Sequence, residues 1–185
     1  NKAILERIID KINRISSINK IIINAFYLAD EMVNFVEKLR NPKIIISREL
    51  DKIETGGGLI FAMDKIDLDS PLLTLNGDVL WRENSDFSDI EYLFSKFDAN
   101  RHNFLLGLKP THDFFGYDGV GDFDLNGDKL SRNFQENKSC SHVYVGMQVL
   151  NPRFILSEYQ KQQMAKCFSV SHFYKTAVDK NYLLT

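Results

Sequence analysis

Apolar residues along this chain follow two spacings, and the two spacings alternate. Within residues 2–16 they return every three or four positions, the period of a helix with one buried face. Shorter continuous apolar runs are typical of strands buried on both faces of a sheet. The pattern predicts helices at about residues 2–16, 28–39, 59–65, 90–97 and from 152 to about 180, and strands at about 20–26, 43–47, 72–75, 104–108 and 142–150.

Alternation of strands and helices predicts an α/β fold, with a mainly parallel sheet and helices on both of its faces. The Asn-Gly pair at positions 126–127 predicts an antiparallel hairpin over residues 122–130, inserted into this arrangement. Residues 181–185 resemble the start of one more strand. At 185 residues the chain is expected to form a single domain that buries roughly 70% of its unfolded surface.

Composition narrows the classes of partner. A hydrophobic fraction of 44% with 26% charged residues is ordinary for a globular domain. The net charge of −2 argues against nucleic acid as a partner, because phosphate binding needs a basic surface. No apolar run approaches the ~20 residues of a membrane span, and the first residues lack a signal-peptide pattern. We therefore expect no membrane partner and a cytoplasmic location.

Two motifs carry the candidate chemistry. Glu54-Thr55-Gly56-Gly57-Gly58 is expected as a turn before a helix, with bare backbone N–H groups that a flat or anionic ligand can approach. Residues 76–78, Asn-Gly-Asp, follow a buried strand. In an open parallel sheet such segments meet at the carboxyl ends of the strands, where ligands bind. Together they predict a nucleotide site, although a triple glycine also occurs as a simple capping turn.

Asp78 has two possible roles. Carboxylate oxygen suits Mg²⁺, which would also need substrate phosphate oxygens, water and a second carboxylate to complete its octahedron. A carboxylate after a strand can instead cap the following helix.

Five segments, in their sequence and their order along the chain, resemble those of the sugar-1-phosphate nucleotidyltransferases. These segments are IIINAFYLADEM, ETGGG, LLTLNGD, GDFDL and HVYVGMQVLNP, at residues 21–32, 54–58, 72–78, 121–125 and 142–152. Within that family the chain is most similar to the branch of N-acetylmuramic acid 1-phosphate uridylyltransferase and mannose-1-phosphate guanylyltransferase-like proteins. The resemblance implies a Rossmann-like, three-layer α/β/α fold of the nucleotide-diphospho-sugar transferase type.

The resemblance also implies roles for residues. The nucleoside would lie against Glu54, Thr55, Gly56 and Gly57. Asn76 and Asp78 would lie by the phosphates, with Asp78 as the catalytic residue and Mg²⁺ ligand. The sugar would be bound by Gly121, Asp122, Tyr144 and Gly146. For Tyr144, packing on the sheet is an equal alternative.

The implied activity transfers a nucleoside monophosphate from a nucleoside triphosphate to a sugar 1-phosphate and releases pyrophosphate. UTP is the first choice of donor and GTP the second, with Mg²⁺ as cofactor. Two alternatives stay open. One is a non-catalytic module that binds a nucleotide or sugar nucleotide, and the other is an unrelated α/β binding protein that shares the glycine turn.

The chain also departs from the family. Nothing in residues 1–30 matches the family's opening strand, its glycine-rich loop with an Arg, or its later Pro-Lys-Pro segment. The family's Trp-x-Asp-x-Gly-Thr segment, whose Asp is a second metal ligand, has no match either, since Trp81 follows the Asn-Gly-Asp motif. We therefore expect a domain shortened at both ends, with weak or no activity. An exposed sheet edge, a dimer or another pairing partner is expected where the first strand would lie.

Overall fold

The computed structural model describes residues 2–83, 88–126, 129–131, 139–179 and 183–184, which form a mixed α/β fold. Its helices are α1 (Ile4–Asn13), α2 (Ala29–Leu39), α3 (Glu54–Phe61), α4 (Asp89–Lys96), α5 (Pro152–Gln162) and α6 (Ser171–Asp179), with short 3-10 helices η1 (Met63–Lys65) and η2 (Thr111–Asp113). Its strands are β1 (Ile21–Ala25), β2 (Ile44–Arg48), β3 (Leu72–Leu75), β4 (Phe104–Pro110), β5 (Asp124–Asn126), β6 (Lys129–Ser131), β7 (His142–Leu150) and β8 (Leu183–Leu184).

These elements agree with the predicted ranges to within a few residues, with two exceptions. The helix expected from residue 152 to about 180 is two helices, α5 and α6, with residues 163–170 between them. Residues 54–58 are the first five residues of α3, and the turn expected before the helix is wrong. The predicted hairpin is present as the antiparallel pair β5–β6, although positions 127 and 128 lie outside the described residues.

The strands form three sheets, and the expected predominance of parallel pairing is not confirmed. β1 and β2 are parallel, and so are β4 and β8. In the sheet of order β3-β7-β4-β8, however, β7 is antiparallel to both β3 and β4. β7 is largely buried, so its apolar run looks like that of a central parallel strand. Such a run reports burial and carries no information about strand direction.

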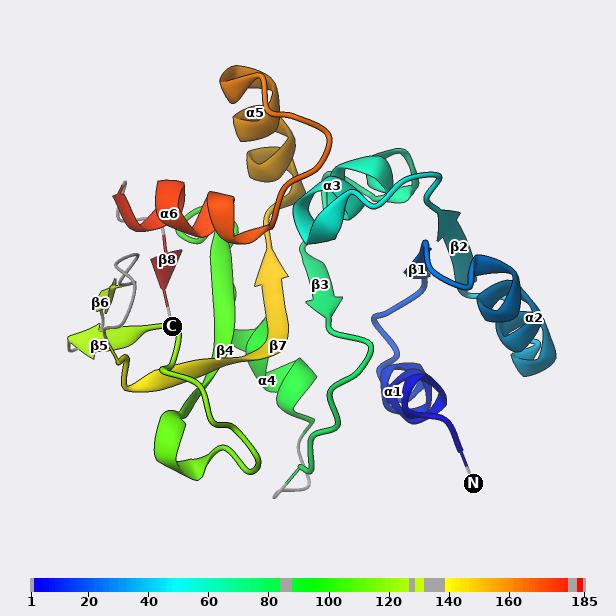
Figure 1. The fold of residues 1–185 in the computed structure, drawn as a ribbon, viewed down its shortest axis with the longest axis horizontal. Helices are drawn as coiled ribbons and strands as arrows, with labels where there is room; N and C mark the ends of the chain where they lie inside the picture. The colour runs from blue at the N-terminus through cyan, green and yellow to red at the C-terminus, as the bar shows by residue number, and fades with distance from the viewer. Residues whose placement is uncertain (1, 84–87, 127–128, 132–138, 180–182, 185) are drawn as a thin grey trace.

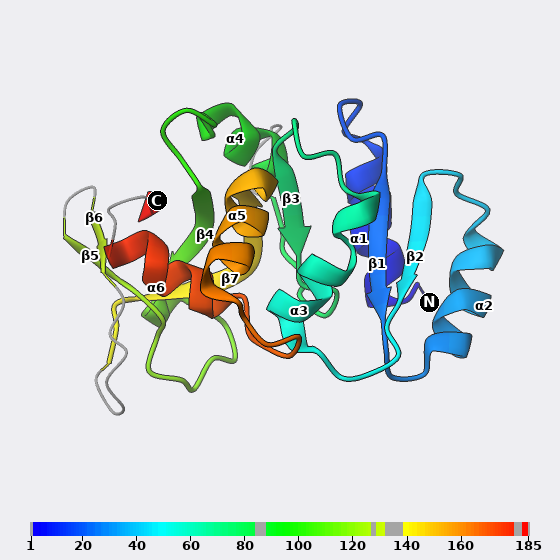
Figure 2. The same ribbon diagram turned by 90° about the horizontal axis from the view of Figure 1, so that it is seen from above.

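Helices cover both sides of the strand layer. Figure 1 shows α3, α5 and α6 on one side of it and α1 and α4 on the other. β1 and β2 lie at one end of the molecule, with β3 as the nearest strand of the larger sheet (Figure 2). β1, β2 and β3 run in the same direction in this view, so their carboxyl ends reach one rim of the molecule.

The core has two parts, one on each side of the strands. Phe104 of β4 belongs to the part that contains Ile155 and Phe173 from α5 and α6. Its neighbour Leu105 belongs to the part that contains Ile8 of α1 and its surroundings. Successive side chains of a strand point to opposite faces, so a continuous apolar strand supplies both parts. In the part of the chain that the structure describes, no helix has the length and apolarity needed to cross a membrane.

Candidate functional site

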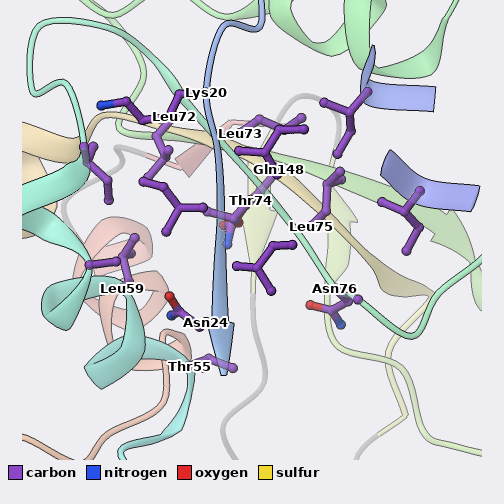
Figure 3. A pocket seen from close by; sticks show the side chains of 18 of the residues that line it. Lys20, Asn24, Thr55, Leu59, Leu72, Leu73, Thr74, Leu75, Asn76 and Gln148 are labelled. Carbon is purple, nitrogen blue, oxygen red and sulfur yellow. The ribbon is translucent and has the colours of Figure 1, made fainter. Parts of the chain in front are cut away.

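A cavity of about 1220 Å³ lies between β1 and β3. Polar side chains line it near both ends of these strands. Figure 3 shows Asn24, Thr55 and Asn76 toward one end of the cavity, and Lys20 and Leu72 toward the other. The rim where the strands end therefore carries one group of polar side chains, and the opposite end carries another that includes Lys20, Asp67 and Ser70.

Both motifs found in the sequence contribute to this cavity. The predicted site residues that line it are Glu54, Thr55, Asn76 and Tyr144. The other predicted residues are not among its lining, namely Gly56, Gly57, Asp78, Gly121, Asp122 and Gly146. The topology thus brings the start of α3 and the end of β3 to one place, although they are separated in sequence by a helix and a loop.

The backbone N–H groups of the glycine motif are bonded to another part of the chain. Gly56 and Gly57 both donate to the carbonyl oxygen of Phe168, at 2.9 and 3.1 Å. The Thr55 hydroxyl oxygen accepts a hydrogen bond from the Val170 N–H at 3.0 Å. The expectation of bare N–H groups is therefore wrong for these two glycines, because the segment before α6 occupies them.

Close approach explains why this part of α3 needs glycine. A Cβ atom at Gly57 would overlap the carbonyl oxygen of Lys166, and one at Gly58 would lie 2.6 Å from Asn24 Nδ2 and from Glu49 Oε1. The glycines lie inside the helix, behind Ile53 at its N-cap, so the capping-turn alternative is also wrong. They let α3 pack against two neighbouring segments.

Two site residues, Asn24 and Glu49, were not recognised in the sequence. Both line the cavity, and both touch the helix at Gly58. Burial raises the pKa of the Glu49 carboxyl above its ordinary value. Asn24 lies near the end of β1 and Glu49 directly follows β2. The rule that drew attention to Asn76, a polar residue where a parallel strand ends, would have found them.

Asn76 packs against β7 at a glycine. Its N–H donates to the carbonyl oxygen of Gly146 at 2.8 Å. Gly146 has a φ of +75°, and a Cβ there would lie 2.9 Å from three atoms of the Asn76 side chain. Glycine at this position therefore allows both the left-handed backbone and the contact with Asn76.

Asp122 and Tyr144 are joined by a hydrogen bond, because Asp122 Oδ2 accepts from the Tyr144 N–H at 2.9 Å. The Tyr144 ring also packs against Tyr174, with centroids 6.2 Å apart. Burial raises the pKa of the Tyr144 hydroxyl, and a hydrogen bond with Thr74 acts in the opposite direction. Tyr144 therefore packs on the sheet, as the alternative interpretation expects, and also lines the cavity.

Asp78 is exposed, two residues beyond the cavity-lining Asn76. It does not cap the next helix, because Ser88 is at the N-cap of α4. Among the residues that the structure describes, no group of three or more His, Cys, Asp and Glu could hold a metal ion. Mg²⁺ commonly binds through one or two carboxylates together with substrate phosphates. The donor chemistry of Asp78 fits that mode of binding.

Comparison with known proteins gives one sequence relative and several related structures, while no family model matches the sequence. The chain is 27% identical over 157 residues to N-acetylmuramate alpha-1-phosphate uridylyltransferase from Caulobacter vibrioides. The match covers 82% of this chain and 63% of the relative, so the chain spans less than two thirds of that enzyme's length.

Two solved structures share the fold. HddC from Yersinia pseudotuberculosis, complexed with GMP-PN, matches with a TM-score of 0.65 at 20% identity. The match covers 91% of this chain and 69% of the HddC chain. The inositol-1-phosphate CTP transferase from T. maritima has a TM-score of 0.73 at 11% identity, over 98% of this chain and 71% of its own. The chain is therefore similar in sequence to a uridylyltransferase, and it shares its fold with these two solved structures.

Proposed function

We propose that this chain is the substrate-binding part of an enzyme that transfers a nucleoside monophosphate from a nucleoside triphosphate to a sugar 1-phosphate. The observation that carries the proposal is that Glu54 and Thr55 of one motif and Asn76 of the other line the same cavity. UTP is the first choice of donor, because the sequence relative is a uridylyltransferase. GTP is the second, in line with the nucleotide analogue GMP-PN bound to HddC.

The reaction needs positioning more than covalent help from the protein. An oxygen of the sugar phosphate attacks the α-phosphorus of the nucleotide in line and forms a new P–O bond. The bond from the α-phosphorus to the oxygen that bridges to the β-phosphate breaks, and pyrophosphate leaves with that electron pair. Holding both phosphates in line supplies most of the required rate enhancement, together with stabilisation of the developing charge.

Different side chains would bind the nucleoside, the phosphates and the sugar. Glu54 and Thr55 would contact the nucleoside, with Gly56 and Gly57 beside them in α3, and Asn76 would bind the phosphates. Glu54 has a φ of +58°, an uncommon conformation for a residue other than glycine and one that is frequent at functional sites. The sugar would lie toward β7, against Gly121, Asp122, Tyr144 and Gly146.

Asp78 would hold Mg²⁺ together with the phosphate oxygens of the substrate. When bound, the ion would neutralise negative charge that develops on the phosphates during transfer. A cytoplasmic location and the organisation as a single domain remain predictions from the sequence.

Calorimetry with UTP, GTP and CTP, each with and without Mg²⁺, tests the proposal. We expect binding that is stronger with Mg²⁺, and we expect Asp78→Asn to remove the Mg²⁺ dependence. Asp118→Asn is the matched control, because Asp118 is also exposed and is not assigned to the site. Failure of all three nucleotides to bind would contradict the proposed function. A Mg²⁺ effect that survives Asp78→Asn would contradict only the metal assignment.

A pyrophosphate-release assay with sugar 1-phosphates measures turnover. We expect rates far below the ~10 per second of an ordinary enzyme. Tight nucleotide binding with no sugar nucleotide formed from any sugar phosphate would support the alternative of a non-catalytic binding module.

A further inference from the structure

Phe26 is a partly exposed aromatic residue at the end of the cavity where β1 ends. It directly follows β1, lines the cavity and is 43% exposed. Apolar surface in contact with water is unfavourable, and an aromatic side chain carries more of it than most others. Aromatic side chains are common in the walls of ligand cavities. Phe26 is therefore a candidate contact for a ligand that occupies this end of the cavity.

Polar side chains line the same end of the cavity. Asn24 lies two positions before Phe26, which is the spacing of side chains that share one face of an extended segment. Thr55 lies beside Asn24 where β1 ends (Figure 3), and Glu54 precedes it at the start of α3. An aromatic ring bordered by hydrogen-bonding groups matches a ligand that has a flat apolar face and a polar edge.

The backbone is anchored on both sides of Phe26. The Ala25 carbonyl accepts a hydrogen bond from the Glu49 N–H at 2.8 Å, which joins the end of β1 to the segment after β2. The Leu28 carbonyl accepts one from the Met32 N–H at 3.0 Å, in the first turn of α2. Only two residues lie between these anchors. The position of Phe26 at the cavity is therefore set before a ligand binds, which lowers the entropic cost of binding.

The turn after Phe26 contains an uncommon backbone conformation. Leu28, at the N-cap of α2, has a φ of 52°, and Glu54 at the start of α3 has a φ of 58°. Few residues other than glycine adopt this left-handed region, and those that do are concentrated at functional sites. The turn after β1 thus shares a feature with the start of α3, against which the nucleoside is proposed to bind.

We propose, resting on the proposed function, that the Phe26 ring stacks on the base of the bound nucleotide and holds the nucleoside against Thr55. Every nucleobase has a flat π face, so a stacked ring binds the base without selecting one base over another. A stacked base covers the exposed face of Phe26 and leaves its own polar edge free for hydrogen bonds with Asn24 and Glu54. The selection between UTP and GTP then depends on these polar contacts.

The test compares Phe26→Leu, which removes the aromatic face, with Phe61→Leu as the matched control. Phe61 of α3 is 44% exposed and is not among the residues that line the cavity. In calorimetry with Mg²⁺, we expect Phe26→Leu to bind UTP and GTP about tenfold more weakly, as is typical for the loss of one stacked base. Phe61→Leu should leave both affinities unchanged, and Phe26→Tyr, which keeps the ring, should bind like the natural chain.

A second measurement uses the natural chain and does not depend on the folding of a variant. NMR should detect nuclear Overhauser effects between the Phe26 ring and the H5 and H6 protons of UTP. Equal affinities of the natural chain and Phe26→Leu, or effects from Phe26 to a sugar 1-phosphate in place of the base, would overturn the inference and leave the proposed function intact. If no nucleotide binds to the natural chain, the proposed function is contradicted and the inference is overturned with it.

Discussion

Replacing Gly57 with alanine tests the close packing that positions the start of α3. The added Cβ would overlap the carbonyl oxygen of Lys166 and lie 2.9 Å from Ile53 Cβ. The segment that carries Lys166 would have to move away from the helix. That movement would stretch the hydrogen bonds from Gly56 and Gly57 to Phe168 O, now 2.9 and 3.1 Å long.

The expected loss of stability is the sum of two costs and one gain. Overpacking at a buried site costs about 1–3 kcal/mol. Each weakened hydrogen bond costs about a further 1 kcal/mol. Alanine in place of glycine in a helix returns about 1 kcal/mol. We therefore expect Gly57→Ala to lower the free energy of unfolding by about 2–4 kcal/mol.

Urea unfolding followed by circular dichroism measures this loss. Gly77→Ala is the control, because a Cβ at Gly77 has nothing within 4 Å and the free energy of unfolding should change by less than ~0.5 kcal/mol. A Gly57→Ala variant that is as stable as the natural chain, or more stable, would refute the packing argument, since helix propensity would then outweigh the contact.

Three further predictions concern single side chains. Asn151 accepts hydrogen bonds from two N–H groups in the first turn of α5, so Asn151→Ala should lower the free energy of unfolding by about 1 kcal/mol in urea melts. Ser88→Ala, at the start of α4 where no side chain caps the helix, should lower it by less. The His102 ring accepts a hydrogen bond from the Asp98 N–H at 3.0 Å, and burial lowers the pKa of His102. The stability that neutral His102 contributes should therefore be lost as the pH falls through this pKa. A titration midpoint of His102 at or above ~6.5, measured by NMR, would contradict this. Burial raises the pKa of Glu49, so Glu49→Gln should be more stable than the natural chain at pH 7, with the difference vanishing below about pH 4; urea midpoints that differ equally at both pH values would exclude this cause.

Local patterns were enough to predict most elements of the fold. The three-and-four spacing of isoleucines gave α1, and continuous apolar runs gave the buried strands. The direction of β7 could not be predicted, because a strand buried on both faces has the same sequence pattern in either orientation. Its antiparallel pairing with β3 and β4 depends on how the segment after β4 returns to the sheet.

Residues of the candidate site could be predicted where the order and direction of the strands determine their position. Thr55 and Asn76 were expected at one rim, and both line the cavity. The hydrogen bonds from the Gly56 and Gly57 N–H groups to Phe168 O join segments more than 100 residues apart. The sequence contains no local signal for such contacts. Asn24 and Glu49 were missed because a lone polar residue at or just after the end of a strand belongs to no motif.

Amide chemical shifts during a titration with UTP test the central claim, that a nucleoside triphosphate binds in the cavity between β1 and β3. We predict that the signals of Thr55 and Asn76 shift with UTP or GTP in the presence of Mg²⁺. The signal of Thr176 on α6, which is not part of the cavity lining, should stay in place. If neither Thr55 nor Asn76 responds to any nucleotide, or if the shifts gather around α6 instead, the account of this site is contradicted.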